Sequence, residues 1–295
     1  MGLDDNDDKK AFGNSFKKHT SNIAIWGGFL TASLIVYKLL SSGDFSFLLT
    51  YASFMRCFGF SLLNFKMLSS KSAKGVSMKT LQLYGLTFAV RLVSILRHQG
   101  YLPFDKTGDW FYHLVEVISL LAVFTSIYGI VGPLISTYDE KYDKFGNFKI
   151  ANQYGAFYLI IPCVILAIVF HPTLNREWLS DVCWTLSMYL EAVAMLPQIY
   201  MFQKQAADLG GAVDALIGHT VFALGFSRIF ELIFWFGSFR ELADHHNGGS
   251  RLPGYIVLIS QFGHLIVMAD FFYYYFMSLS RGTPMELPTS YQSFV

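Results

Sequence analysis

The sequence predicts an all-α membrane protein, a polytopic bundle whose helices cross the bilayer repeatedly. Three observations predict this class. Of the 295 residues, 53% are hydrophobic and 17% are aromatic. Only 15% are charged, against roughly 25% in a soluble domain. Apolar stretches of about 20 residues, the length that a helix needs to cross the hydrocarbon core, recur along the chain between short polar segments.

Eight of these stretches are predicted to span the membrane. They cover approximately residues 21–40, 45–66, 80–97, 110–135, 153–171, 179–202, 215–238 and 254–279. We expect the first to be retained rather than removed as a secretory signal, because it is long enough to span and no small-residue cleavage site follows it cleanly. The second contains Arg56 and is the least typical of the eight.

Lysine and arginine residues between the spans orient the bundle, because short basic loops stay on the cytosolic side. With a cytosolic N-terminus, thirteen basic residues fall on the cytosolic side and six on the opposite side. The thirteen are Lys9, Lys10, Lys17, Lys18, Lys66, Lys71, Lys74, Lys79, Lys141, Lys144, Lys149, Lys204 and Arg281. We therefore expect both termini in the cytosol, residues 1–20 as a disordered tail and residues 283–295 as a second tail.

Charged residues also occur inside the predicted spans. They are Arg56, Arg91, Arg228, Glu116, Asp181, Glu191, Glu231 and Asp270. A charge at bilayer depth is costly unless it faces the bundle interior, water or a counter-ion. For each residue two interpretations stay open, a structural ion pair that locks helices together or a group that lines a polar cavity. Because the eight charges mix both signs, we expect them to share a polar cavity.

The sequence contains no pattern for catalysis, a cofactor or a metal. Cys57, Cys163 and Cys183 lie in apolar spans without CxxC spacing, so no disulfide framework is implied. The eight histidines lack metal-ligand spacing, and His219 and His264 are interpreted as satisfied core residues. There is no Gly-rich phosphate loop, Ser-His-Asp set or HExxH motif. We expect no enzyme, no cofactor, no metal and no nucleic-acid partner.

Two stretches resemble each other, "FSLLNFKMLSSKSAKGVSMKTLQLYGLTFAVRL" and "VAMLPQIYMFQKQAADLGGAVDALIGHTVFALGFSR". Each contains an apolar helix that ends in a lysine, a small polar loop and a helix that ends in an arginine. Lys66 and Arg91 are 25 residues apart, and Lys204 and Arg228 are 24 apart. Such helical-hairpin repeats, inverted-looking here, are typical of transporter-like folds with polar sites at the repeat interface. Arg91 and Arg228 are then pseudo-equivalent.

Pro197 and Gln198 interrupt the sixth span. A proline inside a membrane helix frees backbone carbonyls and kinks the helix, which is tolerated where a neighbouring helix or a cavity supplies partners. We therefore expect a hinge or a cavity-lining break at this pair. A Pro-Gln pair before a short loop resembles the PQ-loop signature, which small-solute transporters share with one receptor family.

Four longer motifs carry a closer resemblance, "CWTLSMYLEAVAMLPQIYMFQK", "HTVFALGFSR", "ADFFYYYF" and "STYDEKYDKF". Together they resemble the KDEL-receptor family, the ER lumen protein retaining receptors, from about residue 45 to 282. The resemblance implies a seven-helix, PQ-loop and SWEET-like domain over residues 43–282. Residues 21–42 are then an extra N-terminal membrane helix, which agrees with the cytosolic N-terminus that the basic residues predict.

The resemblance implies a receptor that binds the C-terminal KDEL- or HDEL-like peptide of escaped ER proteins. Such receptors bind cargo in the mildly acidic Golgi, return it in COPI vesicles and release it at neutral pH. The implied location is the ER and cis-Golgi membrane, with the COPI coat and membrane lipid as further partners. The alternative is a PQ-loop-type transporter or an early-secretory trafficking regulator that binds no such peptide.

The resemblance also points to ligand-binding residues. The nine candidates are Arg56, Arg91, Asp181, Trp184, Glu191, Arg228, Glu231, Trp235 and Asp270. A peptide carboxylate in a membrane cavity needs arginines, which are always charged and bind in a bidentate manner. The basic end of the peptide needs acids and an aromatic wall. Arg91 matches a carboxylate-binding arginine of the family, and Arg228 with Asp270 would form an ionic switch.

Several positions depart from the family pattern by ungapped placement. The substituted positions are Leu49 for an arginine, Arg56 for the pH-sensing histidine, Ser94 for an aspartate, Ser227 and Glu231 for tyrosines, Ser238 for an arginine and Thr283 for a lysine of the retrieval signal. Because Arg56 stays charged, it cannot switch binding on below about pH 6.5. Glu191 and Glu231 are the remaining candidates for sensing protons. The extra helix and this altered pocket resemble a longer, divergent receptor-like branch known from plants.

Overall fold

The computed structural model of the chain describes residues 4–41, 43, 45–98, 109–147, 154–209, 211–242 and 249–287. The α-helices of these ranges are α1 Asp4–Leu40, α2 Phe47–Ser70, α3 Met78–Ile95, α4 Asp109–Val131, α5 Phe157–Val169, α6 Trp178–Val193, α7 Leu196–Leu209, α8 Ala215–Gly237 and α9 Leu252–Arg281. Two 3-10 turns cover Ile135–Thr137 and Phe239–Leu242. Two antiparallel strands of two residues each, β1 Ala212–Val213 and β2 Met285–Glu286, complete the structure. The predicted all-α membrane class is confirmed.

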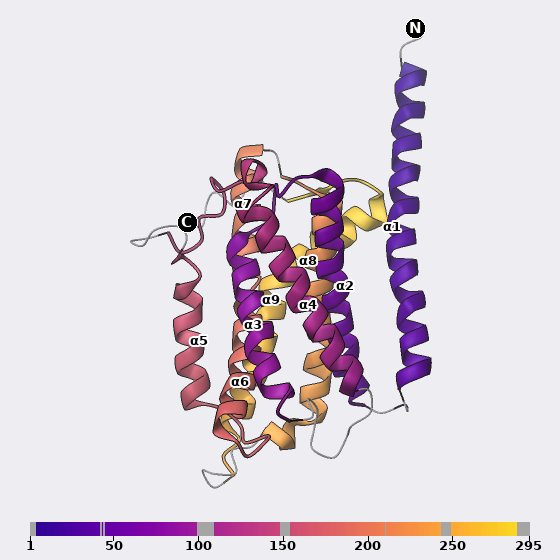
Figure 1. Cartoon of the computed structure of the whole chain (residues 1–295). Coiled ribbons are helices and arrows are strands. Elements are labelled where there is room, and N and C mark those ends of the chain that lie inside the picture. The colour runs from indigo at the N-terminus through magenta and orange to yellow at the C-terminus, as the bar shows by residue number, and fades with distance from the viewer. Residues whose placement is uncertain are drawn as a thin grey trace.

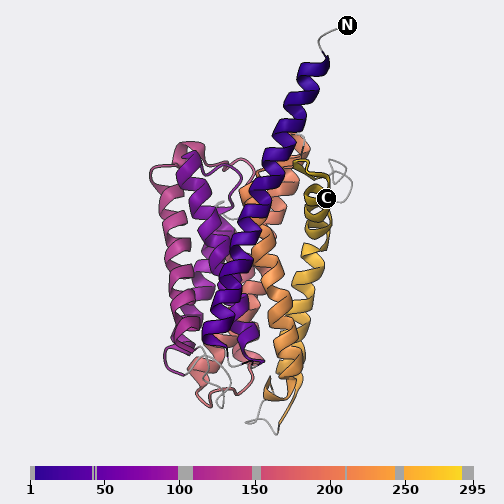
Figure 2. The ribbon, with the colours of Figure 1, turned by 90° about the vertical axis from the view of Figure 1, so that its right-hand side faces the viewer.

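The helices form an upright bundle with α1 on its outside (Figure 1). The views in Figures 1 and 2 agree that α1 runs along the bundle and extends well beyond it at its N-terminal end. Helix α5 lies at the edge of the bundle and packs on α6. Helix α9 ends at the same end of the bundle as the start of α1, so the chain enters and leaves the bundle at one end.

Five of the eight predicted spans are confirmed as helices long and apolar enough to cross a membrane. They are Asn22–Leu40, Trp110–Val131, Trp178–Asp208, Ala215–Gly237 and Leu252–Arg281. Helices α2 and α3 do not meet this measure, and each buries an arginine, Arg56 or Arg91, among polar neighbours. Helix α5 has 13 residues, which at about 1.5 Å per residue is roughly 20 Å, short of the ~30 Å hydrocarbon core.

Residues 4–20 are helical in the structure, whereas the sequence predicts a disordered tail there. Helix α1 begins at Asp4 and continues without a break through residues 4–20 into the first predicted span. The sequence is compatible with this, because the segment has no proline and opens with four aspartates. Negative charge at a helix N-terminus is favoured by the helix macrodipole. Residues 1–3 lie outside the described residues.

The predicted break in the sixth span is present. It separates α6 from α7 at Ala194 and Met195, so that Pro197 is the second residue of α7. A proline in the first helical turn is tolerated, because the N–H groups there have no partner within the helix. Gln198 is buried and bonds to protein backbone. Its Oε1 accepts from Ser77 N at 2.9 Å and its Nε2 donates to Gly75 O at 2.8 Å.

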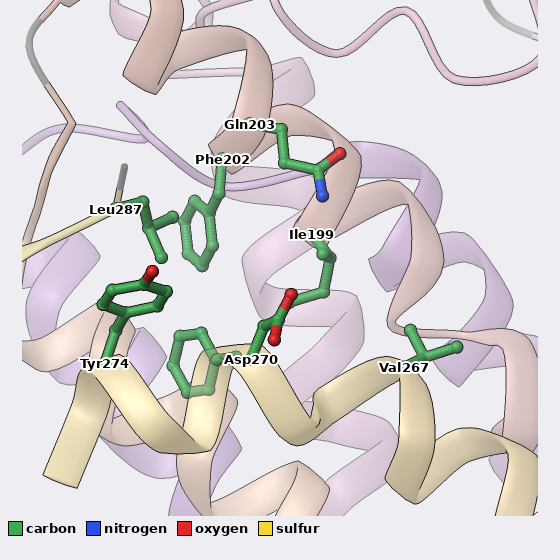
Figure 3. A pocket seen from close by; sticks show the side chains of 8 residues that line it. Ile199, Phe202, Gln203, Val267, Asp270, Tyr274 and Leu287 are labelled. Carbon is green, nitrogen blue, oxygen red and sulfur yellow. The ribbon is translucent and has the colours of Figure 1, made fainter. Parts of the chain in front are cut away.

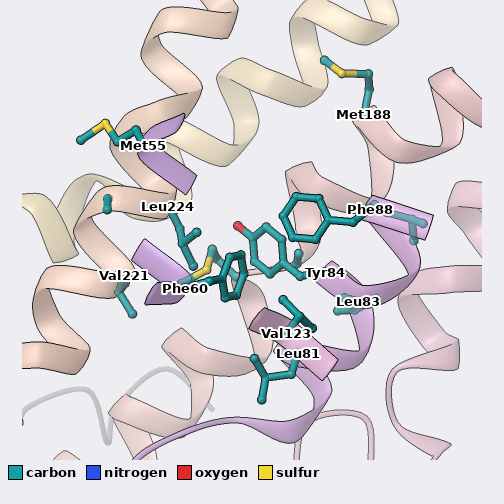
Figure 4. Close-up of a cluster of buried hydrophobic side chains, with 14 of the residues drawn as sticks. Met55, Phe60, Leu81, Leu83, Tyr84, Phe88, Val123, Met188, Val221 and Leu224 are labelled. Atoms are coloured by element: carbon teal, nitrogen blue, oxygen red, sulfur yellow. The ribbon is translucent and has the colours of Figure 1, made fainter. Parts of the chain in front are cut away.

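The centre of the bundle is formed by the close approach of α2 to its neighbours. On one side Phe60 of α2 packs edge-on against Tyr84 and Phe88 of α3, with ring centroids 5.0 and 5.6 Å apart (Figure 4). On the other side Gly59 of α2 lies so near α8 that an added Cβ would meet Ala223 Cβ at 3.2 Å. This small-residue contact lets the two backbones approach.

Candidate ligand-binding site

Arg56 of α2 is surrounded by three glutamates from three other helices. Its guanidinium pairs with Glu231 of α8, with Glu191 Oε1 of α6 at 3.1 Å and with Glu116 Oε1 of α4 at 3.1 Å. Arg56 Nη2 also donates to Ser53 Oγ at 2.6 Å, and that hydroxyl donates to Glu116 at 2.7 Å. One arginine therefore joins α2, α4, α6 and α8.

The other two buried arginines share the same glutamates. Arg91 of α3 pairs with Glu191, approaches Glu116 Oε1 to 3.3 Å and donates from Nε to Ser187 Oγ at 3.2 Å. Arg228 of α8 pairs with Glu191 Oε2 at 3.1 Å and with Glu231 one helical turn away. Glu191 thus contacts all three arginines. We name these six residues, Arg56, Arg91, Arg228, Glu116, Glu191 and Glu231, the charge cluster.

The charge cluster is closed to solvent in this conformation. Each of its six residues is 2% exposed or less. Three arginines and three glutamates carry no formal net charge, so each buried charge has counter-ions of the opposite sign. This pairing offsets the large cost of removing the charges from water. The expected convergence of charges from different helices is therefore correct, but an open cavity shared by all eight is not what the structure contains.

Two tryptophans lie on the same helices as cluster residues. Trp184 of α6 and Trp235 of α8 meet edge to face, with ring centroids 4.8 Å apart, and both are buried. Trp184 lies seven residues, about two helical turns, from Glu191, and Trp235 lies four residues, about one turn, from Glu231. Trp235 Nε1 has no hydrogen-bond partner among the described residues. An aromatic wall and an unpaired donor therefore stand one to two helical turns from the charges.

The proposed ionic switch between Arg228 and Asp270 is wrong for this structure. Arg228 is buried and pairs with Glu191 and Glu231. Asp270 lies on an exposed position of α9, where it lines a small pocket with Ile199, Phe202 and Tyr274 (Figure 3). The buried residues of α9 form a stripe along one face of the helix, and Asp270 is not among them. The Asp270 carboxylate therefore faces away from the cluster.

Asp181 does not join the cluster either. It lies in the first turn of α6, and its Oδ1 accepts from Asn175 N at 2.8 Å. Glu191 is ten residues further along the same helix, roughly 15 Å away along the axis. Asp181 therefore orders the loop before α6 in this conformation.

Glu116 is a central member of the cluster. It is among the eight charges that the sequence predicts to share a cavity but not among the nine candidate ligand-binding residues. The available signal was a single acid inside a strongly apolar span. Ser53 and Ser187, which hydrogen-bond to the arginines, carried no signal, because serines are common in membrane helices. His264 of α9 is also buried; its Nδ1 bonds to Ala192 O at 2.8 Å, whereas its Nε2 has no hydrogen-bond partner among the described residues, so the expected core histidine is only half satisfied.

Comparison with known proteins assigns the chain to a family. The sequence profile described as ER lumen protein retaining receptor matches residues 72–238. This chain belongs to that family. The ER lumen protein-retaining receptor of Petunia hybrida is 31% identical over 229 residues, which cover 77% of this chain and 92% of the relative. Receptor B of Arabidopsis thaliana is 30% identical with the same coverage, and the Drosophila melanogaster receptor is 25% identical over 78% of this chain and 93% of its own length.

The ER lumen protein retaining receptor profile covers most of the charge cluster. Five of the six cluster residues lie within residues 72–238, whereas Arg56 precedes the match. Three positions that are expected from the sequence to depart from the family pattern, Leu49, Ser94 and Ser227, lie on α2, α3 and α8 and are buried, and the Ser227 hydroxyl donates to Leu224 O.

Proposed function

We propose that this protein is a membrane receptor for C-terminal ER retention signals of the KDEL or HDEL type. The observation that carries the proposal is the convergence of Arg56, Arg91 and Arg228 on one buried point of a bundle that belongs to the retaining-receptor family. Buried arginines are costly in a membrane and are retained where they serve an ion pair or an anionic ligand. The relatives' names supply the retention role.

The terminal carboxylate of the peptide binds Arg91 in place of a glutamate. An arginine presents two parallel N–H groups to a carboxylate, and Glu191 and Glu116 occupy such donors of Arg91 in the closed conformation. Binding therefore requires α3 and α6 to separate enough for the ligand carboxylate to replace a glutamate. The displaced carboxylate is then available to the basic end of the peptide, with Trp184 and Trp235 as the wall.

The proposed receptor domain has seven spans, formed by α2, α3, α4, α5, the α6–α7 pair, α8 and α9. This arrangement counts α6 and α7 as one span with a break before Pro197, as in a PQ-loop fold, and leaves α1 as the extra helix. We place both ends of the chain in the cytosol, and the receptor in the ER and cis-Golgi membranes. Retrieval from the Golgi would use the COPI coat. The role is that of a non-enzymatic receptor.

The test is peptide binding to the detergent-solubilised full-length protein. Synthetic peptides ending in KDEL or HDEL should bind, and the same peptides with a C-terminal amide should bind at least tenfold more weakly, because a charge-assisted contact is lost. Arg91→Ala should abolish binding. The matched control is Arg240→Ala, an exposed arginine outside the cluster. Absence of binding at every pH between about 5 and 7.5 would contradict the proposal.

A further inference from the structure

A second polar site lies at the end of the bundle where the chain enters and leaves. A cavity of about 480 Å³ opens between the end of α2, the loop after it, the end of α7, β1 and the start of α8. Its wall includes Lys66, Lys74, Ser70, Ser72, Gln205 and Asp214. The volume falls within the range of small-molecule sites. Lys66 is ten residues beyond Arg56 on α2, roughly 15 Å along the axis, so the two sites are separate.

Lys66 is a buried cation with no ion-pair partner among the described residues. The residue is 4% exposed, and its Nζ donates to Ser72 O at 3.2 Å and to Lys74 O at 2.9 Å. In the part of the chain that the structure describes, no carboxylate pairs with this ammonium group within 4.0 Å, and Asp214 and Asp139 act on it electrostatically from further away. An ammonium has three donors, and the backbone carbonyls account for two. A buried charge is costly unless it is paired, so the cavity offers the place for the missing anion.

The remaining wall favours a negative ligand. Lys74 adds a second, exposed ammonium, and Ser70, Ser72 and Gln205 add neutral polar groups. Asp214 is the one carboxylate among these wall residues. Its Oδ1 accepts from Leu216 N at 3.0 Å and from Ile217 N at 3.3 Å as the N-cap of α8. The positive end of the α8 macrodipole partly offsets that carboxylate.

The internal repeat shows that a lysine at this position need not be buried. Lys204, which stands in the second hairpin where Lys66 stands in the first, is exposed and lies 5.5 Å from the ring centroid of Tyr200. Lys204 is not among the residues that line the cavity. The two lysines therefore share a place in the sequence repeat but not an environment.

We propose that this cavity binds a phosphate group, with Lys66 as its buried counter-ion and Lys74 as its second contact. Free inorganic phosphate and the headgroup of a phosphorylated lipid both present this chemistry. The site does not depend on the receptor function proposed above. A bound phosphate would fix the loop between α2 and α3 to α7 and α8, the same loop that Gln198 holds through Gly75 and Ser77.

The experiment measures the melting temperature of the full-length protein in two arms. In detergent, inorganic phosphate is titrated against sodium chloride of equal ionic strength. In nanodiscs, phosphatidylcholine alone is compared with phosphatidylcholine that contains a phosphatidylinositol phosphate. We expect stabilisation in at least one arm, and the arm that responds identifies the source of the phosphate.

Two variants and one control link the response to the cavity. Lys66→Met should raise the half-saturating concentration roughly tenfold or more, since a charge-assisted contact is lost. Lys74→Met changes an exposed side chain and leaves the buried contacts in place, so it should weaken phosphate binding by about threefold. This variant tests the cavity if Lys66→Met does not fold. Lys204→Met should respond like the unaltered protein. Equal responses of the cavity variants and Lys204→Met, or no response in either arm, would overturn the proposal.

Discussion

Glu191 is the residue on which the charge cluster depends most, because it touches all three arginines. Glu191→Gln keeps the shape of the side chain but leaves three arginines facing two glutamates. Removing one partner of a buried ion pair costs about 3–5 kcal/mol, since the remaining charge is left uncompensated. At about 2–4 °C per kcal/mol for a chain of this size class, the melting temperature should fall by roughly 6–20 °C.

The assay is thermal unfolding of the purified protein in detergent, with Glu140→Gln as the control, since Glu140 is an exposed glutamate outside the bundle core. That control should melt like the unaltered protein. A second variant restores charge balance: Glu191→Gln combined with Arg228→Met leaves two arginines and two glutamates. Neighbouring charges are coupled by about 0.5–3 kcal/mol, so the double variant should be more stable than the sum of the single changes. Strict additivity, or a Glu191→Gln protein as stable as the control, would refute the reasoning.

Gly59→Leu should destabilise the protein by about 1–3 kcal/mol in a denaturation assay, because the Cβ of the new side chain would meet Ala223 Cβ at 3.2 Å. The control Gly27→Leu should leave the stability unchanged, because a Cβ at residue 27 would meet nothing within 4 Å. Tyr275→Phe removes the hydroxyl that bonds to Trp26 Nε1 at 2.9 Å and to His219 Nδ1 at 2.6 Å. The free energy of unfolding should fall by about 1–3 kcal/mol, and α1 should become accessible to protease. The control Tyr273→Phe, at an exposed position, should do neither. The pKa of Glu177 lies below its ordinary value because the carboxylate bonds to His98 and accepts from Ser180. A carboxylate whose pKa is lowered by folding adds stability above its unfolded-state pKa, and this stability is lost as the pH falls through the folded-state pKa. The difference in melting temperature between the unaltered protein and Glu177→Gln should therefore begin to narrow below about pH 4.3 and close at lower pH. A difference that stays constant down to pH 2 would contradict the last prediction.

The helices were predictable because membrane helices are bounded by length and by polar breaks. The break before Pro197 was predictable from the geometry of proline. The ends of the helices were less predictable. Residues 153–171 are predicted as one span, and nothing in the apolar length of that stretch indicates that the helix covers only Phe157–Val169.

The membership of the charge cluster was only partly predictable, because an acid in an apolar helix does not reveal which face it occupies. Glu116 points into the bundle and Asp270 lies on the outside of α9, yet both are single acids in long apolar runs. In a helix that contacts lipid, the outward face is as apolar as the inward face, so hydrophobic periodicity gives little guidance. The polar positions Gln261 and His264, both buried, mark the inward stripe of α9 better than its hydrophobic residues do.

The balance of three arginines against three glutamates also bears on how fast a ligand is captured. Clefts of one sign raise association rates by focusing the field on an oppositely charged ligand, and this steering weakens with added salt. A balanced set of charges projects little field beyond its own neighbourhood. The speed of peptide capture should therefore depend on how often the helices part, and ionic strength should hardly change it.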